Sequence, residues 1–177
     1  MIKRYSIVLL LFLILSCKSK EEKMFFDFDS VEYYSLNKNK EKEIVENYNK
    51  DFVFEKILYT EFPKELNNEE FLKAINSDGF SRHKILEKDI KSLNENVFVE
   101  KFSPSVFQYE KACIPEYRDI LVFRKKNKIT GIAKICLSCE QYYLSSSKKN
   151  IQTENFGSDG EFESLKNLFK TYKKPLN

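Results

Sequence analysis

Two apolar segments separated by a short polar stretch constrain the fold of this chain more than any other feature. The segments are Ile120–Phe123 and Ile129–Ile135, both rich in β-branched residues, and Arg-Lys-Lys-Asn-Lys lies between them. Asn127 tolerates the positive φ that tight turns require. The pattern predicts a β-hairpin over about 118–137. Because nearly every strand position is apolar, we expect the hairpin at the centre of a sheet, covered on both faces.

Three of the four cysteines, Cys113, Cys136 and Cys139, lie at the open end of the predicted hairpin. A turn in the middle of the polar stretch places Cys113 opposite Cys139, within the distance that a disulfide requires. The same register places Cys136 opposite Tyr117, where it would be a small buried apolar residue. Pro115 can bend the first strand, so a Cys113–Cys136 disulfide remains an alternative.

Cys136 and Cys139 also have the spacing of a redox-active pair, and a thiol-dependent envelope redox protein is the alternative function. Thioredoxin-like pairs lie at a helix N-terminus, whereas this pair ends a strand and precedes a loop. A zinc site would need a fourth ligand, and the only histidine, His83, is distant in the sequence and is interpreted as a surface residue. We therefore predict no metal, no cofactor and no catalytic residue.

Hydrophobic spacing and capping residues predict the remaining elements. They are strands within Met24–Leu36 and over Phe52–Phe62, helices from Asn67 to Gly79, over Arg82–Phe98 and from Phe162 to Tyr172, and a long loop over Gln141–Asn155. Arg118 and Asp119 are interpreted as an ion pair at the sheet edge. The predicted fold class is α+β, an antiparallel sheet with the central hairpin and helices packed on one side.

The N-terminal residues have the organisation of an export signal. Lys3 and Arg4 form a basic start, Ile7–Leu15 is an uninterrupted apolar run, and Ser16 precedes Cys17. The apolar run is shorter than the roughly 20 residues that a membrane-spanning helix needs. An ordinary secretory signal with an incidental Cys17 is the alternative interpretation.

Ile14-Leu15-Ser16-Cys17 resembles the lipobox of bacterial lipoproteins, with Ile14 where Leu is usual. The resemblance implies cleavage before Cys17 and acylation of that residue. Lys20-Glu21-Glu22 is similar to the export tag of Bacteroidota surface lipoproteins. Together with the Cys-x-Pro-x-Tyr-Arg-Asp hairpin, these motifs resemble small lipoproteins of Flavobacteria-like bacteria. The resemblance implies a lipid anchor in the cell envelope, at the outer membrane on its periplasmic face or at the cell surface, and it implies no activity.

The sequence thus predicts a signal peptide over 1–16, a lipidated cysteine with a charged tether over 17–24, and a single globular α+β domain over 25–177. Without Lys3 and Arg4 the mature chain has 28 basic and 27 acidic residues, mixed along the sequence. A nucleic-acid-binding surface needs clustered basic residues, so nucleic acid is not expected as a partner. The expected partners are the membrane, through the anchor, and a protein or small molecule bound by a non-enzymatic module.

Overall fold

The computed structural model describes residues 23–47, 51–101 and 113–173. The predicted lipidation site, Cys17, lies outside the described residues, as do the predicted signal peptide and most of the tether. In chain order the elements are β1 (Ser30–Leu36), α2 (Lys38–Glu46), α3 (Phe52–Tyr59), α4 (Glu69–Ile75), β2 (Phe80–Lys84), α5 (Glu87–Ser92), the π-helical turn η1 (Leu93–Val97), β3 (Asp119–Lys125), β4 (Lys128–Cys136), β5 (Gln141–Ser146) and α6 (Glu161–Lys173).

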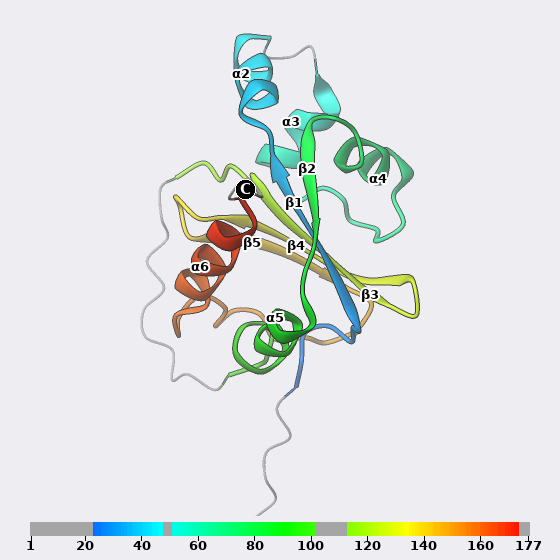
Figure 1. Ribbon diagram of the computed structural model, residues 1–177, viewed down its shortest axis with the longest axis vertical. Coiled ribbons are helices and arrows are strands. Elements are labelled where there is room, and N and C mark those ends of the chain that lie inside the picture. The colour runs from blue at the N-terminus through cyan, green and yellow to red at the C-terminus, as the bar shows by residue number, and fades with distance from the viewer. Residues whose placement is uncertain (1–22, 48–50, 102–112, 174–177) are drawn as a thin grey trace, which may run out of the picture.

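The five strands form one antiparallel sheet in the order β2-β1-β3-β4-β5, shown in Figure 1. The predicted α+β fold and the central position of the β3–β4 hairpin are confirmed. Lys126 and Asn127 form the turn with φ values of 47° and 65°. Positive φ at both central residues is the conformation that matches the twist of the flanking strands.

The sheet separates two hydrophobic cores, one on each face. Along β3, Leu121 and Phe123 enter a core with η1 and α6. Ile120 and Val122 point the other way, into a core with α2, α3 and α4. The sequence predicts helices on one side only, and this detail is wrong: helices cover both faces (Figure 1). The central strands are apolar on both faces, and both must therefore be shielded from water.

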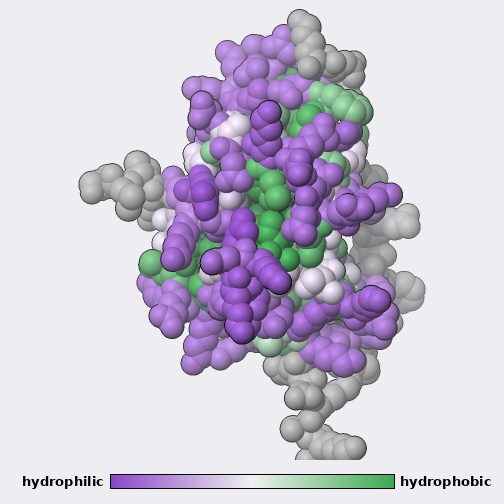
Figure 2. All heavy atoms as spheres, turned by 90° about the vertical axis from the view of Figure 1, so that its right-hand side faces the viewer, coloured by the Kyte–Doolittle hydropathy of each residue, from purple (hydrophilic) through white to green (hydrophobic). Residues whose placement is uncertain are grey.

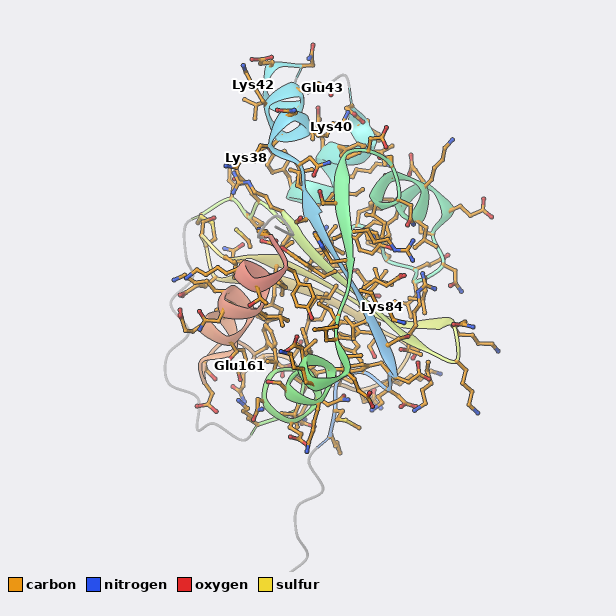
Figure 3. The ribbon with its side chains drawn as sticks, viewed as in Figure 1. Lys38, Lys40, Lys42, Glu43, Lys84 and Glu161 are labelled. Carbon is orange, nitrogen blue, oxygen red and sulfur yellow. A yellow bond between two sulfur atoms is a disulfide. The ribbon has the colours of Figure 1, made fainter. Side chains whose placement is uncertain are left out.

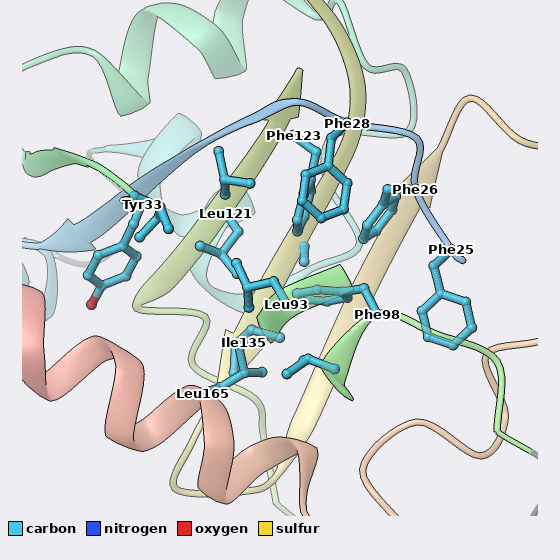
Figure 4. Packing of buried hydrophobic residues seen from close by; sticks show 14 of the residues in the cluster. Phe25, Phe26, Phe28, Tyr33, Leu93, Phe98, Leu121, Phe123, Ile135 and Leu165 are labelled. Atoms are coloured by element: carbon cyan, nitrogen blue, oxygen red, sulfur yellow. The ribbon is translucent and has the colours of Figure 1, made fainter. Parts of the chain in front are cut away.

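The segment before β1 fills part of the first core with aromatic rings. Phe26 stacks on Phe123 with ring centroids 4.3 Å apart and also contacts the ring of Phe98, as Figure 4 shows. A Cβ atom at Gly131 would lie 2.2 Å from the Phe26 ring, so β4 accepts this ring only because position 131 has no side chain. The first residues after the tether are therefore firmly packed on the sheet.

The segment predicted as a strand over Phe52–Phe62 is the helix α3, so this prediction is wrong. Phe54, Ile57 and Leu58 are the buried residues of α3, at the i, i+3, i+4 spacing of one helix face. The predicted helix over Arg82–Phe98 is divided into β2, α5 and η1. The predicted loop after Cys139 contains β5, whose residues are all half-buried at the sheet edge.

The remaining helices agree more closely with their sequence patterns. Asn68, one residue later than predicted, caps α4 by accepting a hydrogen bond from the backbone N–H of Phe71 at 2.9 Å. The predicted apolar face of the last helix is present, with Phe162, Leu165 and Phe169 buried. None of the helices within the described ranges is both long and apolar enough to cross a membrane.

Candidate functional site

The open end of the hairpin carries a disulfide between Cys113 and Cys139, the pairing that the hairpin register predicts. The two Cα atoms are 6.0 Å apart and the residues are 26 positions apart in the chain. The bond joins the segment before β3 to the turn after β4. The side-chain amide of Gln141 donates a hydrogen bond to the Cys113 carbonyl oxygen at 3.1 Å, which ties the same corner to β5.

Cys136 ends β4 and is a buried thiol with only 1% of its surface exposed. Its Sγ accepts a hydrogen bond from the backbone N–H of Glu116 at 3.3 Å, and its side chain packs with Tyr117. The two side chains predicted to face each other are thus in contact, although the β3–β4 pairing ends at Asp119 and Ile135, before it reaches them. Because Cys139 is bonded to Cys113, Cys136 and Cys139 are not paired in this structure.

Lys134, two residues before Cys136, is a fully buried lysine that the sequence analysis did not single out. Its Nζ donates hydrogen bonds to the carbonyl oxygens of Thr60 at 2.5 Å and Phe62 at 2.7 Å. The Nζ atom also lies 4.5 Å from the ring centroid of Tyr117 and 5.4 Å from that of Tyr143. The ammonium group is therefore surrounded by two carbonyl dipoles and two aromatic faces, all of which favour a cation.

The position of Lys134 follows from the sheet register. Lys134 on β4 is the cross-strand partner of Tyr143 on β5, so both side chains point to the face covered by α3. The Tyr143 hydroxyl donates to the Pro63 carbonyl oxygen at 2.9 Å. Since Thr60 is the C-terminal cap of α3, the Lys134 amine donates to the negative end of this helix. Lys134 and Tyr143 together fasten the turn after α3 to the sheet.

The buried surroundings of Lys134 and Tyr117 shift the pKa values of both side chains. Burial lowers the pKa of Lys134 to about 7, and the Glu61 carboxylate acts in the opposite direction. Burial, with a smaller contribution from Cys136, raises the pKa of Tyr117 to about 12. A low lysine pKa is a property that catalytic amines share, but the Lys134 amine is enclosed, and its hydrogen bonds serve the α3 turn.

The ion pair predicted between Arg118 and Asp119 is not formed. Asp119 is buried. Its carboxylate accepts a hydrogen bond from the Tyr33 hydroxyl at 2.5 Å and forms an ion pair with Lys173 at 2.7 Å. Arg118 instead pairs with Glu41 at 2.6 Å. Arg118, directly before β3, reaches α2, whereas the next residue points to the other face of the sheet, which prevents the predicted pair.

His83 lies on β2 and not at the start of a helix. Its ring stacks on Tyr33 at a centroid distance of 5.7 Å and contacts Tyr172 at 6.3 Å. Nowhere in 23–47, 51–101 and 113–173 do three or more histidine, cysteine or acidic side chains come close enough to hold a metal ion.

Two open hollows flank the helices on the α3 face. One, of about 670 Å³, lies between α2, α3 and the turn before β2, and Figure 3 shows Lys38, Lys40 and Glu43 around it. Lys40 is already paired there, with Glu43 at 3.1 Å and Asp51 at 2.7 Å. The other, of about 640 Å³, is lined by the turn that Lys134 holds, including Thr60, Glu61 and Phe62.

Comparison of the chain with protein-family models, with curated proteins and with solved structures found no match.

Proposed function

We propose that this protein is a lipid-anchored lipoprotein of the bacterial cell envelope whose α+β domain is a non-enzymatic binding or structural module. The observation that carries the proposal is the Cys113–Cys139 disulfide at the end of the central hairpin. Structural disulfides persist in oxidising compartments outside the cytoplasm, which agrees with the export signal before Cys17. Two or three acyl chains on Cys17 are sufficient for stable attachment to a membrane, at the outer membrane in this proposal.

The position of the remaining thiol, Cys136, supports a non-enzymatic module over a redox protein. A redox pair exchanges electrons through an accessible thiolate, which is the attacking group in disulfide exchange. Cys136 is buried in contact with Tyr117, and Cys139 is bonded to a residue 26 positions away. The two hollows beside α3 offer concave surfaces to a protein or small-molecule partner.

The anchor is tested by growth with labelled palmitate and purification of the protein. We expect label in the wild-type chain and in Cys136→Ala, and none in Cys17→Ala, because only Cys17 has the context of a lipobox. Cys136→Ala is the matched control, since it removes one thiol elsewhere in the chain. An unlabelled wild-type protein, or label that remains in Cys17→Ala, would refute the anchor.

A further inference from the structure

We infer that the end of the domain nearest to Cys17 is a docking surface for anionic phospholipid headgroups. This anchor-proximal face is defined by six lysines: Lys23, Lys125, Lys126, Lys128, Lys148 and Lys149. The inference rests on the proposed lipid anchor, and it adds an orientation of the domain against the membrane.

Three separate segments meet at this face. The residues before β1 run past the β3–β4 turn, where the Asp29 carboxylate accepts a hydrogen bond from the backbone N–H of Lys126 at 2.9 Å. On the other side Lys148, just after β5, donates from Nζ to the Met24 carbonyl oxygen at 2.8 Å. Lys23 and Lys149 line a hollow of about 480 Å³ together with Lys148 and the partly exposed Met24.

The length of the tether keeps this face close to the bilayer. Lys23 is six residues after Cys17, and a chain of six residues spans at most about 20 Å. An anchored domain therefore presents its lysines to the headgroups at a high effective concentration, so even weak contacts are sufficient to orient it. The opposite end of the molecule, where α2 lies in Figure 1, is much farther from the start of the described chain.

The charge of the face complements an anionic surface. Three carboxylates lie among the six lysines: Asp27, which pairs with Lys125 at 3.2 Å, Asp29 and Glu100. Within the tether, Lys18 and Lys20 are balanced by Glu21 and Glu22. An excess of positive charge thus gathers here, although the mature chain is nearly neutral. Each lysine near an anionic bilayer is attracted to the headgroups, and this attraction decays within a Debye length.

The character of the surface agrees with contact at the headgroup level and not with insertion. Figure 2 shows the side on which the hairpin turn projects, where hydrophilic side chains surround a strip of hydrophobic ones at its centre. Lys126, Lys128 and Lys149 are exposed, and Met24 is a large apolar side chain at this end with 37% of its surface exposed. Such exposed lysines can meet the phosphates of the headgroups without insertion of the domain.

The test is lysine acetylation of the purified lipidated protein, reconstituted into vesicles of phosphatidylcholine alone or of phosphatidylcholine with phosphatidylglycerol. We expect Lys128 and Lys149 to be acetylated about threefold more slowly on the anionic vesicles, and the difference to vanish at high salt. Lys42 on α2 and Lys73 on α4 are internal controls that should react equally on both; Figure 3 labels Lys42 at the far end. Equal rates at Lys128 and Lys149 on the two vesicle types would overturn the docking surface.

A charge-reversal pair provides the matched comparison. Lys128→Glu/Lys149→Glu should abolish the protection of Lys126 and Lys148, whereas Lys42→Glu/Lys73→Glu should leave it unchanged. If both pairs lose protection, or neither does, the face is not the docking surface.

The mass of the peptide that contains Cys17, read in the same experiment, reports on the anchor separately. If it carries no acyl chains, the proposed anchor fails, and the same protein is then sedimented with the two kinds of vesicle. Sedimentation with anionic vesicles alone would still support the face, and equal sedimentation would overturn it.

Discussion

Replacing Cys113 and Cys139 together by alanine is expected to lower the free energy of unfolding by about 3.5 kcal/mol. The disulfide closes a loop of 26 positions, and restricting such a loop in the unfolded chain stabilises the folded state by roughly this amount. The effect should be visible as a lower midpoint in urea unfolding followed by circular dichroism, with a somewhat steeper slope because the unfolded chain without the bond is less compact.

Two comparisons separate the bond from its side chains. Cys136→Ala removes a buried thiol that is not bonded, and it should cost less than about 1.5 kcal/mol. Adding a reductant should bring the wild-type protein close to the double variant and leave the double variant unchanged. A double variant as stable as the oxidised wild type would show that the bond does not support the hairpin.

Replacing Lys134 by methionine is expected to change how stability depends on pH. Burial lowers the folded-state pKa of Lys134 to about 7, below its ordinary value of 10.5. Between these values the unfolded chain holds a proton that the folded protein has released. The wild-type free energy of unfolding should therefore rise with pH across this window, by up to about 1.4 kcal/mol per pH unit. Below pH 7 the cost of a buried charge is fully present.

The measurement is the free energy of unfolding in urea, taken for the wild type and for Lys134→Met from pH 6 to pH 9. The contributions of the other titrating groups cancel in the difference between the two proteins. The wild type should gain about 2 to 3 kcal/mol relative to the variant between pH 7 and pH 9. Lys128→Met, at an exposed lysine of the hairpin turn, should show no such trend. A difference that is flat with pH would mean that the carbonyl groups of Thr60 and Phe62 hold the ammonium charged throughout.

The hairpin and its disulfide could be predicted because their signals are local. The turn residue Asn127 and the two apolar runs determine the hairpin, and the hairpin brings the segment before β3, with Cys113, close to the turn after β4, with Cys139. The structure contains a register shift between Phe123 and Arg124, and this irregularity moves the pairing by only one position. A pairing within one hairpin depends on few other parts of the chain.

The contacts of Lys134 could not be predicted in the same way, because its partners are distant in the sequence. The carbonyl groups that bind Lys134 come from residues 74 and 72 positions earlier in the chain. A lysine within the apolar run of β4 was the available signal, since such a residue on a covered strand must find polar partners. The identity of those partners depends on α3, a segment predicted as a strand.

The wrong elements share a physical cause, which is that tertiary packing overrides a local pattern. Phe52–Tyr59 is rich in aromatic and branched residues that suit a strand, but its buried residues lie on one helix face against the second core. Gln141–Ser146 contains serines and tyrosines and resembles a loop, yet it pairs with β4 along its whole length. An edge strand has one partner and needs less apolar surface than a central one.

The most direct test of the account is thiol mapping of the mature protein isolated from membranes, with alkylation before and after reduction and the peptides identified by mass. We expect acyl chains on Cys17, a Cys113–Cys139 bond, and a Cys136 thiol that reacts only after unfolding. A Cys136–Cys139 bond that a mild reductant opens, with Cys113 free, would contradict the structural role of the disulfide and favour a redox protein.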